Sequence, residues 1–261
     1  MSKVVVITGA SQGIGHAMAA YFAAQDCKVY DLSRHGESTA QVTHLYCDVT
    51  DEQSVLDAVQ TIMQHELAID ILICNAGFGI AGAVEFTKIE DAHRQFDVNF
   101  FGALSTVQAV LPIMRQQQRG RIVFVSSVAA VFAIPFQSFY SAAKSALNAM
   151  ALALRNELAA YKDIQVSVVQ LGDVASHFTA SRKTDWSGEE VYPRMRASIA
   201  SMEHDEQSGM TPEYVAKRVG RLLRRKTIPP VYTIGRVYRL FVFLQRLLPQ
   251  RFVRWLVGKM Y

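Results

Sequence analysis

Cysteine is scarce in this chain of 261 residues: there are three, Cys27, Cys47 and Cys74, and no two of them form a CxxC pair. A scattered, odd set of this kind gives no disulfide framework and no cysteine zinc site. The seven histidines show no metal-ligand spacing either, so we expect no bound metal. Each cysteine falls inside or next to an apolar run typical of a strand, which predicts reduced core thiols in a cytoplasmic protein.

Long hydrophobic runs, repeats and linkers rich in proline or glycine are also missing. No stretch reaches about 18 uninterrupted apolar residues, so we expect no membrane-spanning helix. The first residues hold too short an apolar run for a secretory signal. Half of the residues are apolar (50%), which excludes a disordered or fibrous chain and is ample for one large buried core.

Acidic residues are almost absent from the last part of the chain. Residues 211–261 contain 12 Lys and Arg against the single Glu213, whereas residues 1–210 contain 15 against 22 Asp and Glu. The net charge of +4 therefore hides a strongly basic end on an acidic body. A segment this basic indicates an interaction surface.

The body of the chain alternates between two kinds of segment. Short runs rich in Val, Ile and Tyr predict buried strands, and apolar residues at intervals of three and four predict helices between them. The strands are expected at 4–8, 28–32, 42–47, 69–74, 121–126, 165–170 and 231–233, and the helices at 14–25, 52–66, 88–118 and 138–161. This alternation predicts a single doubly wound α/β domain over 1–234, a Rossmann-type parallel sheet of about seven strands with helices on both faces.

A long irregular stretch, 175–210, follows the sixth predicted strand. Such a stretch in a compact domain is more typical of a lid or binding loop, so we expect it to shape a substrate site. Thr211-Pro212-Glu213 comes after it and predicts a helix start, because proline is favoured in the first turn.

Gly9, Gly13 and Gly15 come directly after the first predicted strand and open the first predicted helix. Glycine lets the backbone turn tightly and approach a pyrophosphate, whose negative charge is favoured by the N–H groups and dipole of a helix beginning near Gly13. The alternative is an ordinary glycine-rich turn. The position between strand and helix favours dinucleotide binding.

The end of the second predicted strand bears on the choice between NADP(H) and NAD(H). Folds that bind these cofactors commonly place an acidic residue there for the ribose hydroxyls, or an arginine for a 2′-phosphate. Here the tip carries Ser33 and Arg34, while Asp31 lies earlier on the strand. Because a guanidinium grips phosphate with two bonds and Ser11 adds a hydroxyl, we predict NADP(H). In the alternative, a shift of one residue in strand register lets Asp31 select the cofactor and leaves Arg34 solvated.

Tyr140 and Lys144 stand four residues apart in an alanine-rich helical segment, so both project from one face. An unperturbed tyrosine has a pKa of about 10, and a neighbouring ammonium stabilises the phenolate and lowers that value. A phenol with a pKa closer to ambient pH is a better acid–base catalyst. Pairs at this spacing also occur by chance on many helices, so the pair needs support from other motifs.

Further motifs supply that support. They are TGASQGIG at 8–15, Asp48-Val49, Cys74-Asn75-Ala76-Gly77, Asn99 in DVNFFG, Ser126-Ser127, YSAAK at 140–144 and a degenerate LGDVAS at 171–176. In their order and spacing the chain resembles the short-chain dehydrogenase/reductase family over about residues 3–176. The last part of the chain follows the family only loosely.

The resemblance implies roles for four residues at the catalytic end. Tyr140 would protonate a carbonyl oxygen as hydride arrives, or remove the hydroxyl proton in the oxidative direction. Ser127 would hold that oxygen, and Ser126 fits this role less well by spacing. Lys144 would lower the pKa of Tyr140 and bind the nicotinamide ribose, while Asn99 would anchor a water that relays protons.

The resemblance also implies which residues hold the cofactor. They are Gly9, Ser11, Gln12, Gly13, Ile14 and Gly15 in the glycine turn, Ser33 and Arg34, Asp48 and Val49 at the adenine, Asn75, Ala76 and Gly77 beside the fourth strand, Tyr140 and Lys144, and Gly172, Val174 and Ser176 at the nicotinamide. Three positions depart from the family pattern. Cys74 replaces an asparagine, which we expect to alter packing only. Leu171 replaces a proline, which predicts a looser turn, and Ser176 replaces a threonine but keeps a hydroxyl.

Residues 128–139, VAAVFAIPFQSF, contain few polar groups and are expected beside Ser127 and Tyr140. We therefore predict an NADP(H)-dependent oxidoreductase acting on a carbonyl or alcohol of a lipophilic substrate such as a steroid, a retinoid or a long-chain keto compound. An equal alternative for this segment is core filling or a subunit contact. The alternative for the whole protein is a catalytically silent dinucleotide-sensing or scaffold protein of the same fold.

We predict a separate basic extension over 235–261, in which six Arg and Lys alternate with apolar residues and Trp255. Basic amphipathic stretches with aromatic residues lie in membrane interfaces, so peripheral membrane contact is one interpretation. The other is a tail that packs on its own domain or on a sister subunit. No nucleic-acid-binding motif accompanies the charge, so we expect no nucleic acid partner. The family resemblance implies a homodimer or homotetramer formed through the long helices that contain Asn99 and Tyr140.

Overall fold

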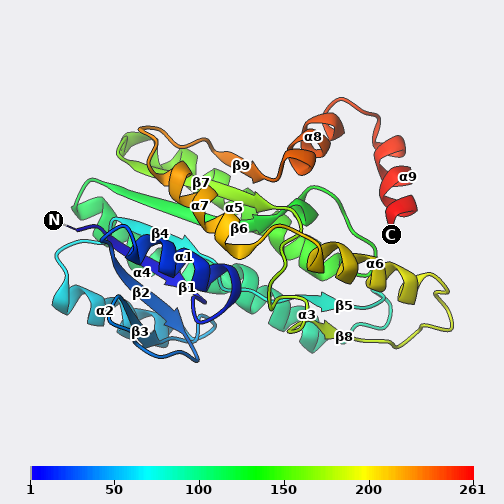
Figure 1. Ribbon diagram of the computed structural model, residues 1–261, viewed down its shortest axis with the longest axis horizontal. Helices are drawn as coiled ribbons and strands as arrows, with labels where there is room; N and C mark the ends of the chain where they lie inside the picture. Colours follow the sequence, from blue (N-terminus) through cyan, green and yellow to red (C-terminus); the bar gives the residue numbers. More distant parts are fainter. Residues whose placement is uncertain (1) are drawn as a thin grey trace.

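The computed structural model describes residues 2–261, except for the side chain of Met260. Its centre is a seven-stranded sheet in the order β3-β2-β1-β4-β6-β7-β9 (Figure 1). The strands are β1 Val4–Thr8, β2 Lys28–Ser33, β3 Val42–Tyr46, β4 Ile71–Cys74, β6 Gly120–Ser127, β7 Ile164–Leu171 and β9 Val231–Ile234. Every pairing in this sheet is parallel. The predicted doubly wound α/β sheet is therefore confirmed.

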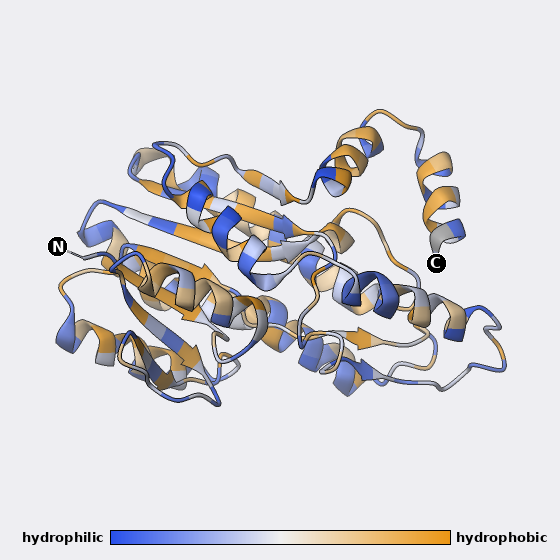
Figure 2. Ribbon diagram, in the orientation of Figure 1, coloured by the Kyte–Doolittle hydropathy of each residue, from blue (hydrophilic) through white to orange (hydrophobic). Residues whose placement is uncertain are grey.

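Helices cover both faces of the sheet, because the central strands are apolar on both sides. In β1, Val4 and Val6 pack into one core, while Val5 and Ile7 pack into the other. The helices α2 Glu52–His65, α4 Gly102–Gln116 and α5 Ser138–Glu157 supply the first core, and α1 Gly13–Ala23 and α7 Pro212–Leu223 supply the second. The hydrophobic colouring of the strands in Figure 2 follows from this burial.

The helix expected at 88–118 is divided into three parts. They are α3 Ile89–Phe96, a π-helical turn η1 Asp97–Phe101, and α4. Among the described residues, only this combined helix, Ile89–Gln116, is long and apolar enough to cross a membrane, and 33% of its most apolar window is buried inside the protein. Core helices of globular proteins meet the same criterion, and this one packs on the sheet.

The stretch 175–210 is not the irregular loop that we expected. It contains β8 Lys183–Thr184, which pairs with β5 Ile80–Ala81, and the helix α6 Met195–Gln207. Its buried residues Met195, Ile199 and Met202 pack in a third apolar cluster. They recur at four- and three-residue intervals, which is a helical signal hidden among charged neighbours.

The chain ends in a two-helix arm, α8 Arg236–Gln245 and α9 Gln250–Met260, at the edge of the sheet that carries β9 (Figure 1). Gly235 joins β9 to α8 with a φ of 101°, a conformation that favours glycine. Before it, α7 begins as predicted, because the Thr211 hydroxyl accepts a hydrogen bond from the backbone N–H of Tyr214. The boundary between a domain and an extension at 234/235 stays a prediction.

Candidate active site

The glycine turn after β1 forms a concave stretch of backbone. Gly9 and Gly13 have φ values of 66° and 57°, in the left-handed region that favours glycine. A Cβ on Gly15 would lie 2.2 Å from the carbonyl oxygen of Gly9, so no larger residue fits there. The helix α1 begins at Gly13 without a side-chain cap on its first N–H groups. This geometry fits a pyrophosphate, which backbone N–H groups bind.

Asn75, directly after β4, braces the glycine turn from behind. Its side-chain Nδ2 donates to the carbonyl oxygens of Thr8, at 3.1 Å, and Gly9, at 2.9 Å. The Thr8 hydroxyl in turn accepts from the backbone N–H groups of Asn75 and Ala76, both at 3.0 Å. The loop after β4 and the loop after β1 are thus held together as one unit.

A single cleft at the carboxyl ends of the strands brings the predicted site together. Every residue expected to hold the cofactor lines it, and so do Ser127, Tyr140 and Lys144. Asn99 does not line the cleft. In open α/β sheets, ligands bind at this end of the strands, where the chain order reverses, as it does here on either side of β1.

Asp31 and Arg34, the two candidates for selecting the cofactor, have different surroundings. Asp31 is buried on β2, where its Oδ1 accepts from the backbone N–H of Ala10 at 2.8 Å and its Oδ2 lies 2.9 Å from the Ser33 hydroxyl. His44 Nδ1 lies 3.3 Å from the same Oδ2. The carboxylate is therefore occupied within the protein and does not line the cleft, whereas Arg34 is exposed and does.

Ser127 is the last residue of β6, and its hydroxyl lies near enough to the phenol of Tyr140 on α5 to lower the pKa of that phenol. The Ser127 Oγ also accepts from the backbone N–H of Ala129 at 3.1 Å. Ser126 is more deeply buried, and its Oγ has no hydrogen-bond partner within residues 2–261. The role of Ser127 at the reacting oxygen stays a prediction.

Burial controls the pKa values of Tyr140 and Lys144. Lys144 donates from Nζ to the carbonyl oxygen of Val125 at 2.9 Å, and its burial lowers its pKa to about 8. Burial raises the pKa of Tyr140 above its ordinary value, although the Ser127 hydroxyl acts in the opposite direction. The Lys144 Nζ lies 5.8 Å from the centroid of the Tyr140 ring. We expected the Lys144 ammonium to lower the pKa of the phenol; in the protein alone burial raises that pKa, and Lys144 is not among the groups that lower it, so the expected direction is wrong.

Asn99 lies behind the cleft in the π-helical turn η1, a feature that sequence reasoning missed. Its side chain is buried and bonds both backbone groups of Phe78, with Oδ1 accepting at 3.0 Å and Nδ2 donating at 3.0 Å. A Cβ built on Gly77 would lie 3.1 Å from Asn99 Oδ1 and 3.5 Å from Lys144 Nζ, so the three residues are neighbours. π-Helical turns are frequent at functional sites.

The turn after β7 contacts the sheet on one side and α8 on the other. Leu171 continues the strand by pairing with Ser127 and Ile234. Gly172 lies so close to α8 that an added Cβ would come within 2.1 Å of the Tyr238 ring. The looser turn expected from the missing proline stays a prediction.

The substrate end of the cleft has walls that the sequence did not reveal. They include Ile134, Phe178, Met202, Glu206, Tyr238 and Tyr261. Of the segment 128–139, Val128, Ala129, Ile134 and Gln137 line the cleft, and Ile134 and Phe136 pack against the cluster on α6. The cleft-lining and core-filling interpretations of this segment therefore both hold in part. No pattern of spacing places Tyr238 or Tyr261 beside Tyr140.

Carboxyl groups stand among these apolar walls. The Tyr238 hydroxyl donates to Asp173 Oδ2, and burial raises the pKa of that carboxyl. Glu206 accepts from the Thr179 hydroxyl at 2.6 Å and pairs with Arg182. The substrate end is thus apolar along its sides and polar at these two carboxyl groups.

Comparisons with known proteins agree with this geometry. The sequence model of the short chain dehydrogenase family matches residues 3–186. A 3-ketodihydrosphingosine reductase of Bacteroides thetaiotaomicron is 36% identical over 231 residues, covering 87% of this chain and 86% of the relative. Dehydrogenase/reductase SDR family member 7B of Xenopus tropicalis is 33% identical over 275 residues, covering 98% and 85%. A short-chain dehydrogenase of Streptomyces avermitilis, 24% identical, shares the fold with a TM-score of 0.86 over 94% of this chain and 92% of its own.

Proposed function

The chain belongs to the short-chain dehydrogenase/reductase family, and on that premise we propose that it is an NADP(H)-dependent reductase of a carbonyl group on a long-chain, lipophilic substrate. The observation that carries the proposal is that Ser127, Tyr140 and Lys144 line the same cleft as the glycine turn. A bound nicotinamide would supply the hydride, and the protein must supply the proton.

The raised pKa of Tyr140 suits reduction. A phenol that burial keeps protonated at neutral pH is ready to give its proton to a carbonyl oxygen that is gaining negative charge. Ser127 would hold that oxygen by a hydrogen bond. Lys144, with a pKa of about 8, is close enough to neutral pH to exchange protons with the phenol after turnover. Asn99 would keep the loop at Gly77 in place beside Lys144.

Two features support NADP(H) over NAD(H). Arg34 is exposed at the tip of β2 in the cleft, where a guanidinium can bind a 2′-phosphate. Asp31, the acidic residue that would otherwise bind the ribose hydroxyls, already accepts hydrogen bonds from within the protein. The glycine turn would hold the pyrophosphate at the start of α1, where no side chain caps the first N–H groups of the helix.

The walls of the cleft support a long-chain keto compound. Ile134, Phe178 and Met202 offer apolar surface for a hydrocarbon chain, and Asp173 and Glu206 offer carboxyl groups to a polar head. The similarity to a 3-ketodihydrosphingosine reductase suggests that a long-chain amino ketone is the first substrate to test. An amine near the reacting carbonyl would be attracted to these carboxyl groups.

The family also suggests a homodimer or homotetramer, which we propose to form through α4 and α5. Phe101, at the start of α4, is 52% exposed and contacts Phe100 edge to face with ring centroids 5.0 Å apart. Phe100 packs against the core, so Phe101 is the exposed member of this pair, and an exposed aromatic side chain next to a long helix is suited to a subunit contact.

Turnover tests the proposal directly. The purified protein would be given NADPH with 3-ketodihydrosphingosine, a long-chain methyl ketone, a steroid ketone and retinal, and the loss of nicotinamide absorbance followed. We expect Tyr140→Phe to lower kcat by about a thousandfold, because general acid catalysis by a positioned side chain contributes about 10²–10⁴-fold. The variant should still bind NADPH.

Tyr46→Phe is the matched control, since Tyr46 is 66% exposed on β3 and away from the cleft. A protein that binds NADPH but reduces none of these substrates, with Tyr140 intact, would favour the catalytically silent alternative. Equal rates for Tyr140→Phe and the unaltered protein would remove the role of the phenol.

A further inference from the structure

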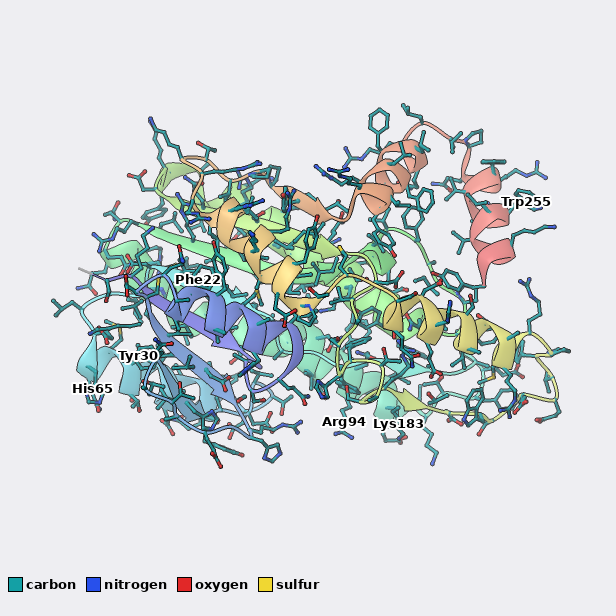
Figure 3. All side chains as sticks on the ribbon, in the orientation of Figure 1. Phe22, Tyr30, His65, Arg94, Lys183 and Trp255 are labelled. Atoms are coloured by element: carbon teal, nitrogen blue, oxygen red, sulfur yellow. The ribbon has the colours of Figure 1, made fainter. Side chains whose placement is uncertain are left out.

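The outer faces of α8 and α9 carry large apolar side chains in solvent. On α8 and just after it these are Val237, Leu240, Phe243 and Leu247, between 54% and 67% exposed. On α9 they are Phe252, Trp255 and Leu256, between 37% and 56% exposed. The spacing of three and four residues places each set on one face of its helix. Figure 3 shows Trp255 on the side of α9 that points away from the sheet.

The same faces carry only positive charge. Arg236, Arg239, Arg246, Arg251, Arg254 and Lys259 are exposed, and residues 235–261 contain no Asp or Glu. Lys259 Nζ lies 5.5 Å from the centroid of Trp255, and a hollow beside that ring is lined by Arg194, Arg254 and Lys259. Three cations around one hollow suit an anionic group such as a lipid phosphate.

The inner faces of both helices are attached to the rest of the protein. On α8, the Tyr238 ring lies against Gly172 and its hydroxyl bonds Asp173, while Val242 is buried. On α9, the carbonyl oxygen of Gly258 accepts from Arg194 at 2.6 Å, and Tyr261 packs beside α6. The arm is therefore held in one orientation, with its apolar and basic faces outward.

We propose that the outer faces of α8 and α9 form a docking surface for a membrane that contains anionic lipids. Exposed aromatic and aliphatic side chains flanked by Arg and Lys are the composition of helices that lie in the interface of a bilayer. A second copy of the chain is a poor occupant, because two such faces would bring together cations with no carboxylate to neutralise them. The negative surface potential of an anionic bilayer matches this charge.

The docking surface and the substrate cleft share the same helices. Tyr238 and Tyr261, on the inner side of the arm, line the cleft that contains Tyr140. If the proposed function is correct, a lipophilic substrate would pass from the bilayer to the cleft along the arm. The docking itself does not depend on the proposed function, and it is tested without substrate.

Vesicle binding by the full-length protein tests the surface. The chain has two tryptophans, so Trp186→Phe leaves Trp255 as the only one. We expect this protein to sediment with phosphatidylcholine vesicles only when they contain phosphatidylglycerol, and the emission of Trp255 to shift to the blue. Added salt should weaken the binding by screening the charges.

Two triple variants then distinguish binding through this surface from attraction by exposed positive charge elsewhere on the protein. Arg236→Gln, Arg239→Gln and Arg246→Gln together should weaken partition by about a hundredfold, since each cation near an anionic bilayer contributes about 1 kcal/mol. Arg115→Gln, Arg119→Gln and Lys162→Gln together remove three exposed cations elsewhere and should leave binding unchanged. Affinity for NADPH checks that each variant is folded.

Three results would overturn the proposal. They are equal sedimentation with and without anionic lipid, equal loss of binding in the two triple variants, and a blue shift of Trp255 on raising protein concentration without vesicles. The last result would assign the surface to a second copy of the chain.

Discussion

The glycine turn at the start of α1 and the arm formed by α8 and α9 meet the same cleft from opposite ends of the chain, and they are built differently. The turn depends on backbone geometry, with positive φ values at Gly9 and Gly13 and no space for a side chain at Gly15. The arm depends on side chains that face in two directions, Tyr238 and Tyr261 inward and apolar and basic residues outward. The first region has the form of a nicotinamide dinucleotide site, and its backbone geometry leaves little space for change at Gly15.

The two regions also differ in how far the match to the family describes them. The match to the family ends at residue 186, before Met202, Glu206, Tyr238 and Tyr261, which form walls of the substrate end. The family therefore establishes the class of chemistry, an oxidoreductase with a nicotinamide dinucleotide. We propose that α6, α8 and α9, whose sequences the family model does not describe, contribute to the choice of substrate.

Replacing Arg34 by alanine should produce the largest effect within the first region. Loss of a guanidinium bound to a 2′-phosphate is expected to lower the preference for NADPH over NADH by about a hundredfold, equivalent to about 3 kcal/mol. The measurement is the ratio of kcat/KM for the two cofactors. Arg119→Ala, which removes an exposed arginine remote from the cleft, serves as the control.

If the ratio of kcat/KM for NADPH and NADH is unchanged in Arg34→Ala, Arg34 does not select the cofactor and Asp31 becomes the candidate. In that case Asp31→Asn should change the ratio, although the carboxylate is buried and already bonded to Ala10 and Ser33. The two variants together decide between the interpretations that the sequence left open.

Lys144→Met should stabilise the protein without cofactor, because the folded state no longer holds a buried ammonium. Burial lowers the pKa of Lys144 from 10.5 to about 8, which corresponds to a destabilisation of the folded state by about 3 kcal/mol. The variant also loses the hydrogen bond to Val125, which destabilises it by about 1 kcal/mol. We therefore expect a gain of about 2 kcal/mol in the free energy of unfolding at neutral pH.

The sign of the pH dependence checks this origin. Below about pH 8 Lys144 is protonated in both the folded and the unfolded protein, so the full destabilisation by the buried ammonium is present. As the pH rises from about 8 to 10.5, the folded lysine loses its proton first and this destabilisation disappears. Urea unfolding at pH 7 and pH 9.5 should thus show a smaller gain at the higher pH. A gain that does not change with pH would point to better packing of methionine.

The parts of the fold that could be predicted are those whose neighbours are close in sequence or fixed by the sheet. Runs such as Val4–Thr8 identify buried parallel strands, because both faces of each strand need apolar side chains. The glycine turn and the Tyr140/Lys144 pair are local patterns as well. All of these lie at the ends of strands that the parallel topology brings to one edge.

The features that could not be predicted depend on packing between distant segments. The π-helical turn at Asn99 has nearly the same apolar period as the helix around it, so the pattern of 88–118 looks continuous. Tyr261 reaches the cleft only because α9 packs beside α6. The pKa of Tyr140 was predicted in the wrong direction because the spacing to Lys144 contains no information on burial, and burial is the larger effect.

Tyr238→Phe should have the smallest effect, and it tests whether the arm belongs to the active site or only covers it. The variant keeps the ring that lies against Gly172 but removes the hydroxyl that donates to Asp173. Loss of one hydrogen bond to a buried carboxyl should lower the free energy of unfolding by about 1–2 kcal/mol.

The hydrogen bond from Tyr238 also lowers the pKa of Asp173 against the effect of burial, so its loss should raise this pKa further. The pH dependence of the KM for the long-chain substrate should then lie at higher pH than in the unaltered protein, with the KM for NADPH unaffected. Tyr214→Phe, at a tyrosine 42% exposed on α7, is the matched control. A variant that loses stability but keeps the KM for substrate at every pH would make Tyr238 a structural contact, and the inward side of the arm would then have to act through Tyr261 alone.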